Sequence, residues 1–372
     1  MRQLSMQKDR TVGALFYFFF GDPNIPKFMK TFNNLYTEIY DYRNLYHAFL
    51  LAQRNKRSKA DVLKFAYKLE ENLHGIQQDL LYKTYEPGEY KEFYVYDPKT
   101  RLIMAAPFRD RVVHHALCNV IEPIFERRFI DASFACRVGR GVDAGVEQVE
   151  KYLRITRHKY GNKVYCLKCD ISKYFQNIDK TILKAILFKK IRCRETRWLI
   201  NKVLDSTPGK TGIPVGNLPS QLFANVYLNE LDHFLKEDMK IKYYVRYMDD
   251  FIILHEDKKF LHNLWKIIEK FLADKLRLRL NRKTAIFPVS QGIDFLGYRI
   301  FINRKILRKQ YVKRMKRMIK HFEREYKAGR MRLEYIQQVL ASWRGRSARA
   351  DVPQLRDDIA KRVWLTFGIN MF

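Results

Sequence analysis

Apolar positions in the N-terminal quarter of the chain recur at the 3.6-residue spacing of amphipathic helices, which predicts helices over residues 31–85. The sequence Glu-Pro-Gly at 86–88 ends this pattern. The period then changes to two, because residues 89–96 and 101–105 alternate as strands do around a turn that contains Asp and Pro. Helical spacing returns over residues 111–125. The pattern therefore predicts helices, a β-hairpin and another helix, in that order.

The centre of the chain is predicted to contain strands that end in acidic residues. Residues 164–169 form an apolar-leaning run that leads directly into Asp170. Residues 243–247 and 251–254 are two further apolar runs, and the short turn 248–250 between them predicts a β-hairpin. The other elements predicted in this region are helices over 181–203, 220–231 and 257–274 and a pair of strands over 293–301.

Residues 303–349 carry a large share of the positive charge, with sixteen Lys or Arg residues against three Glu. The net charge of this segment is +13, compared with +31 for the whole chain. Its apolar side chains recur at helical spacing, at Tyr311, Met315, Met318, Phe322 and Tyr326. We therefore expect an amphipathic helix with a cationic outer face.

Composition narrows the class of protein. With 372 residues, about 150 per domain, the chain has room for two or three structural units, and its 47% hydrophobic content excludes wholesale disorder. The 71 Lys and Arg residues against 40 Asp and Glu require a strongly positive surface, whose natural partner is nucleic acid, with acidic membrane second. Five irregularly spaced cysteines fit a reducing cytosol. The apolar run 12–20 is too short to span a bilayer, which takes about 20 residues, so we expect a cytoplasmic protein without a membrane span.

Three acidic residues carry the sharpest chemical signal. Asp170 follows one apolar strand, and Asp249 and Asp250 occupy the tip of the predicted hairpin. If these strands are neighbours, the carboxylates meet at one edge of the sheet, where like charges require a cation and hard oxygen ligands select Mg²⁺ or Mn²⁺. Two such ions about 3.5–4 Å apart serve in-line phosphoryl or nucleotidyl transfer. The alternative is a plain solvated turn, since Asp is a common turn residue, but the β-rich flanks on both sides favour a site.

Here a resemblance becomes apparent. Tyr247-Met248-Asp249-Asp250 resembles the YxDD box of reverse transcriptases, and residues 167–175 resemble their first catalytic motif. Further blocks occur in the family's order and are similar to the fingers and last palm motifs of group II intron-like enzymes: 98–101, 108–117, 281–284 and 295–298. The resemblance covers residues from about 60 to about 350.

One block departs from the common pattern. Most reverse transcriptases have Gln-Gly, then three residues, then Ser-Pro, whereas this chain has Val215-Gly216 and Ser220-Gln221 at those positions. This departure resembles the reverse transcriptases of diversity-generating retroelements. In that family the enzyme copies a template-repeat RNA with errors opposite adenines, and the mutated cDNA replaces a variable repeat in a target gene.

The resemblance implies an α+β fold, a right-hand polymerase with fingers, an antiparallel-sheet palm and an α-helical thumb. The expected divisions are an N-terminal helical extension, the fingers with part of the palm, the palm with the catalytic motifs, and a basic helical thumb. Their expected bounds are residues 1–57, 58–160, 161–302 and 303–372.

The resemblance also implies roles for individual residues. Asp170, Asp249 and the backbone carbonyl of Ile171 are expected to hold two Mg²⁺ ions, with Asp250 adjacent, and Lys283 to protonate the leaving pyrophosphate. The ring of Phe175 matches the steric gate that excludes a ribose 2′-hydroxyl. The remaining expected nucleotide-binding residues are Lys99 and Arg101, which grip the triphosphate, with Val215 and Gln221, and the expected primer grip is Phe295, Leu296, Gly297 and Tyr298.

Val215 leads to a hypothesis about fidelity. An amide at this position can hydrogen-bond the sugar of the incoming nucleotide, whereas valine supplies only van der Waals contact. We expect Val215 to lower fidelity, most of all for the weak adenine-templated pair. The alternative is that valine simply packs the floor of the site.

The expected partners are template RNA, cDNA, dNTPs and a small basic accessory protein of a bacterial or phage-encoded retroelement. Two alternatives stay open. One is a group II intron-type or retron-type reverse transcriptase of ordinary fidelity, against which Val215 and Gln221 speak. The other is a non-catalytic RNA-binding protein on a polymerase scaffold, against which the presence of all three carboxylates speaks.

Overall fold

The structure is a computed structural model that describes residues 31–96 and 100–370. The chain forms two compact units, each assembled from separate stretches of sequence. Unit 1 contains the described residues up to Ile130 together with Ser172–Lys242 and Phe271–Arg279. Unit 2 contains Asp131–Ile171, Tyr243–Lys270 and the described residues from Leu280 onward. The division into four parts by residue range, expected from the sequence, remains a prediction.

Unit 1 is mainly helical, as the 3.6-residue period of its first part predicts. Its elements are α2 (Tyr36–Tyr40), α3 (Tyr42–Ala52), α4 (Ala60–Tyr67), α5 (Leu69–Leu81), β1 (Lys91–Val95), β2 (Arg101–Ala105), α6 (Phe108–Glu126), α8 (Tyr174–Asn177), α9 (Lys180–Phe188), α10 (Arg194–Asp205), α11 (Leu218–His233) and the π-helix η1 (Phe234–Asp238). The hairpin β1–β2 is antiparallel and pairs Lys91 with Ala105 and Val95 with Arg101.

Helix α6 forms the centre of unit 1. Its apolar face packs against α3, and the rings of Phe49, Phe65 and Phe108 join α3, α4 and α6 at centroid distances of 5.2–6.1 Å. His114 and His115 lie on the same helix, where burial lowers the pKa of His114 to about 3 and that of His115 to about 4. Both histidines are therefore neutral at pH 7, and His114 is buried in the helix core whereas His115 is half-buried.

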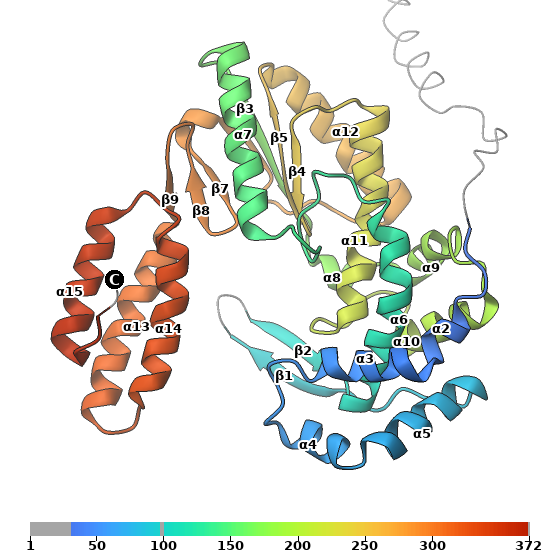
Figure 1. Cartoon of the computed structure of the whole chain (residues 1–372). Helices are drawn as coiled ribbons and strands as arrows, with labels where there is room; N and C mark the ends of the chain where they lie inside the picture. Colours follow the sequence, from blue (N-terminus) through green and yellow to red (C-terminus); the bar gives the residue numbers. More distant parts are fainter. Residues whose placement is uncertain (1–30, 97–99, 371–372) are drawn as a thin grey trace, which may run out of the picture. The chain divides into compact units, whose positions relative to one another are not determined.

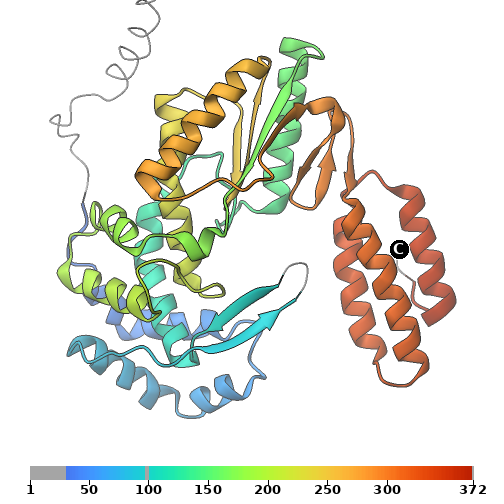
Figure 2. The same cartoon turned by 180° about the vertical axis from the view of Figure 1, so that it is seen from behind.

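Unit 2 is built on a four-stranded antiparallel sheet with strand order β4-β5-β3-β6. Helix α7 covers one face of this sheet and α12, whose last residues belong to unit 1, covers the other (Figures 1 and 2). The bounds are α7 (Val142–Tyr160), β3 (Tyr165–Asp170), β4 (Tyr244–Tyr247), β5 (Asp250–His255), α12 (Lys258–Leu276) and β6 (Ala285–Pro288).

A second sheet and three helices complete unit 2. They are the short 3₁₀ helix η2 (Val289–Gln291), the strands β7 (Ile293–Phe295), β8 (Tyr298–Ile300) and β9 (Lys305–Leu307), and the helices α13 (Lys309–Lys327), α14 (Leu333–Ser347) and α15 (Pro353–Phe367). One hydrophobic core runs from α7 and the main sheet through β7–β9 into these helices. Val149, Phe295 and Trp343 are fully or almost fully buried members of it.

Three expectations about elements require correction. The single amphipathic helix expected over 303–349 is strand β9 followed by two helices, because Gly329 adopts the left-handed conformation (φ 67°) that ends α13. The helical stretch expected over 181–203 is also two helices, α9 and α10. The turn expected over 248–250 contains only Met248 and Asp249, since Asp250 already pairs as the first residue of β5.

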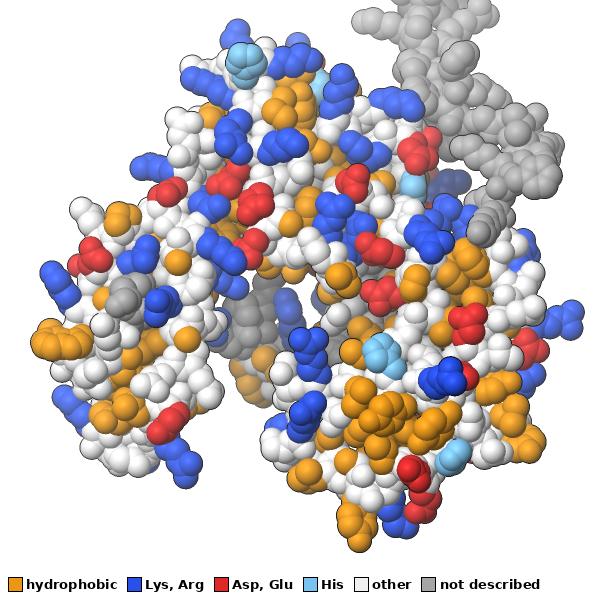
Figure 3. All heavy atoms as spheres, viewed as in Figure 1, with side chains coloured by type: hydrophobic (Ala, Val, Ile, Leu, Met, Phe, Trp, Pro, Cys, Tyr) orange, Lys and Arg blue, Asp and Glu red, His pale blue; other side chains and the backbone are white. Residues whose placement is uncertain are grey.

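Basic side chains spread over the visible surface of both units (Figure 3). All five cysteines are unbridged, and four of them are buried. In the part of the chain that the structure describes, no helix has both the length and the apolar character needed to cross a lipid bilayer.

Candidate catalytic site

The three acidic residues lie together at one edge of the main sheet of unit 2. Asp170 ends β3, Asp250 begins β5, and the two residues are direct cross-strand partners. Asp249 precedes Asp250 in the turn, and its carbonyl accepts a hydrogen bond from the Ile171 amide at 3.3 Å. The strand adjacency on which the predicted site depends is therefore present, although the residues are separated by about 80 positions in sequence.

Alternation along the paired strands decides which side chains reach this edge. On one face, Val164 and Cys166 of the β3 segment are buried in the core, and Ile252 and Leu254 of β5 lie beside them. Asp170 and Asp250 lie on this same face but at the end of the ladder, beyond the hydrophobic core. The hydrophobic part of each strand therefore fixes the register that sets the two carboxylates opposite each other.

The turn that carries Asp249 is strained and held by a buried arginine. Met248 has a positive φ of 57°, which is uncommon for a residue with a side chain. The Arg246 guanidinium donates to the Met248 carbonyl at 3.1 Å, and the Arg246 amide donates to Ala132 at 2.8 Å. Backbone strain of this kind persists where the surroundings over-determine it, which is common at functional sites.

Lys168 is a residue of this site that the sequence reasoning did not single out. Its ammonium group donates to Asp250 Oδ2 at 3.1 Å and to the carbonyl of Asp294 at 2.5 Å. The same ammonium lies 5.6 Å from the ring centroid of Phe295. Lys168 lies two residues before Asp170 and therefore on the same face of the strand. A lysine within an otherwise apolar strand needs an acidic partner, and this is the sequence signal that could have identified Lys168 as a site residue.

Burial and the neighbouring lysine shift the pKa of Asp250 in opposite directions. Burial raises the pKa of this carboxyl, the Lys168 ammonium lowers it, and the nearby Asp170 carboxylate raises it again, with a net upward direction. Asp250 Oδ1 lies 3.1 Å from the Lys168 ammonium, yet it is buried and accepts no hydrogen bond from any described residue. The Lys168 ammonium therefore lies equally close to both oxygens of the Asp250 carboxylate and is its counter-ion.

The donor set suits a hard divalent cation that is completed by other ligands. Asp170 and Asp249 supply half-buried carboxylates at the edge, and Ile171 supplies backbone oxygen beside them. Over residues 31–96 and 100–370, no three His, Cys, Asp or Glu side chains form a ready-made metal cage. Mg²⁺ typically keeps waters and substrate phosphates alongside one or two carboxylates, so such a partial set fits it.

Lys283 lies in a turn attached to the end of β3. The Asn281 amide donates to the Asp170 carbonyl at 2.7 Å, and the Lys283 amide donates to Asn281 Oδ1 at 3.1 Å. Lys283 itself is exposed. The structure therefore places the turn beside Asp170 and leaves the lysine side chain in solvent.

The expected primer grip is the turn between β7 and β8. Phe295 is fully buried, and Leu296 and Gly297 both have positive φ, 51° and 92°. The Tyr298 hydroxyl donates to the Arg346 carbonyl of α14 at 3.2 Å. Through Lys168 on one side and Arg346 on the other, this hairpin is joined to the acidic edge and to the C-terminal helices.

The expected nucleotide-binding residues that the structure describes belong to unit 1. The carbonyl of Phe175 accepts from the Ile213 amide at 2.9 Å, and the carbonyl of Val215 accepts from the Met104 amide of β2 at 3.2 Å. The loop before α11 is thus bonded to both α8 and β2, which brings Phe175 and Val215 into one network.

The other expected nucleotide-binding residues are less closely tied to this network. Arg101 is exposed at the start of β2, and Gln221 is half-buried in the first turn of α11. Lys99 lies outside the described residues.

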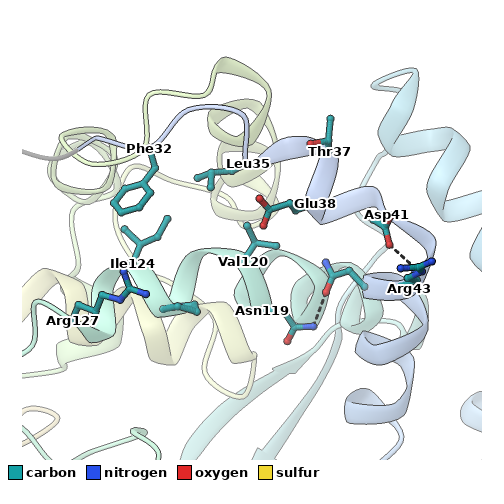
Figure 4. A pocket seen from close by; sticks show the side chains of 12 residues that line it. Phe32, Leu35, Thr37, Glu38, Asp41, Arg43, Asn119, Val120, Ile124 and Arg127 are labelled. Atoms are coloured by element: carbon teal, nitrogen blue, oxygen red, sulfur yellow. Dashed lines mark hydrogen bonds between the residues drawn. The ribbon is translucent and has the colours of Figure 1, made fainter.

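A pocket of about 760 Å³ in unit 1 carries none of the predicted site residues. It lies along α2, α3 and α6. Figure 4 shows Asn119 at its wall, and the Asn119 side-chain amide donates to Asn44 Oδ1 at 2.9 Å. Apolar and charged side chains alternate around it, among them Val120, Glu38 and Arg127. We assign it no function.

Comparison with known proteins supports the sequence motifs. Residues 95–300 match the family model described as reverse transcriptase (RNA-dependent DNA polymerase). The chain is 25% identical over 280 residues to Protein YkfC of Escherichia coli, with 64% of this chain and 73% of YkfC covered. It is also 25% identical over 313 residues to the group II intron-encoded protein LtrA of Lactococcus lactis, with 63% of this chain covered, and it spans half the length of LtrA.

Among solved structures, apo telomerase from Candida tropicalis matches with a TM-score of 0.44 and 12% identity. The match covers 60% of this chain and 47% of the telomerase chain.

Proposed function

Because the chain belongs to the reverse transcriptase (RNA-dependent DNA polymerase) family, its reaction is RNA-directed DNA synthesis, and we propose that it copies a template-repeat RNA into cDNA with errors opposite template adenines. The relatives of the chain place it near the group II intron-encoded proteins. Val215 and Gln221 distinguish it from the usual pattern of reverse transcriptases and support the more specific assignment to a diversity-generating retroelement.

The acidic edge of unit 2 is the proposed centre of the chemistry. Asp170, Asp249 and the Ile171 carbonyl would hold divalent cations, for which we propose Mg²⁺. When bound, these ions lower the pKa of the attacking primer hydroxyl and neutralise charge on the leaving pyrophosphate. Lys283, exposed on the turn bonded to Asp170, would donate a proton to that pyrophosphate. The hairpin of Phe295, Leu296, Gly297 and Tyr298 would hold the primer end.

The proposed nucleotide site uses the residues of unit 1. Phe175 would exclude a ribose 2′-hydroxyl, Arg101 and Lys99 would bind the triphosphate, and Gln221 would lie nearby. The observation that supports the mutagenic assignment is the environment of Val215. The Val215 carbonyl accepts a hydrogen bond from the Met104 amide, and the half-buried side chain has no polar group, so Val215 would offer the incoming nucleotide only apolar contact.

The proposed partners follow from the same assignment. The enzyme would act on template RNA, nascent cDNA and dNTPs, together with a small basic accessory protein. The fingers, palm and thumb would correspond to residues 58–160, 161–302 and 303–372. The helical extension expected over 1–57 lies outside the described residues up to residue 30.

A second candidate is a group II intron-type reverse transcriptase of ordinary fidelity, which the similarity to LtrA favours. The two candidates share the acidic edge and differ in the expected error spectrum. The spectrum of errors by template base therefore decides between them.

The experiment sequences cDNA made from a defined RNA template and tabulates errors by template base. The unchanged enzyme should misincorporate mainly opposite adenine, and Val215→Gln should reduce those errors about five- to tenfold, since each regained hydrogen bond contributes about 1 kcal/mol. Val138→Gln is a matched control, because Val138 is 92% exposed. A flat spectrum would favour the group II intron type, and an unchanged spectrum in Val215→Gln would refute the role of Val215.

A further inference from the structure

Lys168 contacts two parts of the catalytic unit that are far apart in sequence. It lies on β3 between the hydrophobic core and Asp170, and its side chain is 21% exposed. Its ammonium group is shared between the Asp250 carboxylate of β5 and the Asp294 carbonyl of β7. The cation therefore joins the acidic edge directly to the strand that leads into the Phe295 hairpin.

We infer that Lys168 is a positioning residue of the polymerase, whose ammonium group holds the Asp250 carboxylate and the β7–β8 hairpin at a set spacing. This inference rests on RNA-directed DNA synthesis at the acidic edge and is independent of the proposed adenine errors. In the proposed function, Asp170 and Asp249 would hold the metal, with Asp250 beside them as the cross-strand partner of Asp170, and the hairpin would hold the primer end. A single cation bonded to both would align the primer end with the metal site.

The surroundings of Lys168 explain why a cation is needed there. Asp250 faces it from β5, Asp170 lies two residues further along the same strand face, and the Phe295 ring lies beneath the ammonium. Arg308 also approaches this region, at 3.7 Å from Asp294, but it reaches the carboxylate of Asp294 and not its carbonyl. Lys168 is thus the residue that bonds both Asp250 and the main chain of β7.

A lysine here could instead serve stability alone, as one more ion pair in the unit. The two roles differ in their electrostatic consequence. Lys168 places positive charge next to the carboxylates that would hold the metal, so its removal should make the edge more negative and more attractive to a divalent cation. A purely structural role predicts the opposite, because loss of local structure disperses the carboxylates.

Lys168→Met removes the charge and retains most of the length of the side chain. Single-nucleotide addition on a primer–template should lose about 30-fold in kcat, with the KM for dNTP changed less than about threefold, because misplacement of reacting groups by about 1 Å costs up to roughly 100-fold. Lys168→Arg retains the charge and should recover kcat to within about fivefold of the unchanged enzyme. Lys163→Met, at an exposed position before β3, is the matched control.

Two measurements do not depend on catalysis. Mn²⁺ titration of the nucleic-acid-free full chain, followed by electron paramagnetic resonance, should show binding about three- to tenfold tighter in Lys168→Met, and weaker binding in Asp170→Asn. Amide hydrogen exchange should rise over residues 293–300 in Lys168→Met and stay unchanged over α7. If Lys168→Met does not fold, Lys168→Gln provides the same comparison with a polar side chain.

Slower addition together with tighter Mn²⁺ binding and faster exchange in the hairpin supports the positioning role. Unchanged kcat overturns it, as does a parallel loss of kcat and Mn²⁺ affinity with increased exchange throughout unit 2. The error spectrum of the unchanged enzyme is read separately, so failure of the adenine proposal leaves this test intact.

Discussion

The acidic edge of unit 2 and the Val215 loop of unit 1 are held in different ways. The edge lies at the end of an antiparallel ladder in which β3 pairs from Tyr165 to Asp170, and its Asp250 carboxylate is bound by the Lys168 ammonium. The loop is held by single backbone hydrogen bonds to β2 and α8, and the Val215 side chain carries no polar group. The ladder therefore fixes charged groups through many paired residues, whereas the loop is fixed by a few backbone hydrogen bonds and presents an apolar side chain.

The largest effect that this comparison predicts is at the edge. Asp249→Ala should reduce primer extension about 1000-fold or more, because it removes a carboxylate that would stabilise charge at the reacting phosphate. Binding of primer–template, followed by fluorescence anisotropy, should change little. Glu269→Gln, an exposed acid on α12, is the control. Retained extension in Asp249→Ala would contradict the assignment of the chemistry to this edge, whereas no cDNA synthesis by the unchanged protein would favour a non-catalytic RNA-binding protein.

A smaller effect is expected in the loop. Gly216 has a φ of 111°, and a Cβ at this position would lie 3.1 Å from Ile103 Cγ2 of β2. Gly216→Ala should therefore displace the loop and lower kcat/KM for dNTP about tenfold, since the strained backbone costs about 1–2 kcal/mol. Steady-state single-nucleotide addition measures the change.

Gly75→Ala is the matched control for that loop variant, because a Cβ added to Gly75 meets nothing within 4 Å. A tenfold fall in kcat with KM unchanged would contradict a role of the loop in nucleotide binding. It would indicate that the loop acts on the chemical step, as the acidic edge does.

The smallest predicted effect is a pH dependence of stability that is expected in α6 of unit 1, with β3 of unit 2 as the reference. Burial lowers the pKa of His114 from 6.5 to about 3, so the folded state keeps it neutral and the unfolded state takes up a proton below about pH 6.5. Its contribution to stability is complete above pH 6.5 and is lost as pH falls toward 3. The slope is about 1.4 kcal/mol per pH unit, and His115, with a pKa of about 4, adds a similar slope.

Hydrogen exchange of the α6 amides between pH 4.5 and 6.5, corrected for intrinsic rates, measures this slope. His114→Gln should remove about half of it, and His158→Gln, at an exposed position on α7, should leave it unchanged. Amides of β3 serve as the internal reference. An α6 slope that is the same in His114→Gln and the unchanged protein would show that His114 is not kept neutral by the fold.

Much of the candidate site was predictable because its residues stand at the ends of elements. Asp170 follows a strand, and Asp249 lies in a tight turn between two strands, so both positions follow from local pattern alone. Lys168 was missed because the sequence shows a charged residue within an apolar strand but does not show which distant residue is its partner. Its partners, Asp250 and Asp294, come from strands more than 80 positions away.

The boundaries of helices and strands likewise depend partly on local pattern and partly on distant contacts. The basic stretch 303–349 shows helical periodicity at residues 311–326, and that pattern does not show where α13 stops and α14 starts. The break at Gly329 depends on a left-handed backbone conformation that glycine permits but does not require. Folding decides the matter, because α13 and α14 must both turn their apolar faces to the same core.

By itself, the amino-acid sequence determined the residue chemistry: three carboxylates at strand ends, a valine where an amide is usual, and an excess of positive charge. The tertiary structure decided which strands are neighbours, that Asp250 is bound by Lys168 and that the hairpin beside them is joined to α14. The physical reason is the distance along the chain over which each effect acts. Periodicity and turn propensity act over a few residues, whereas strand pairing and buried charge pairs depend on distant segments that only a folded chain brings into contact.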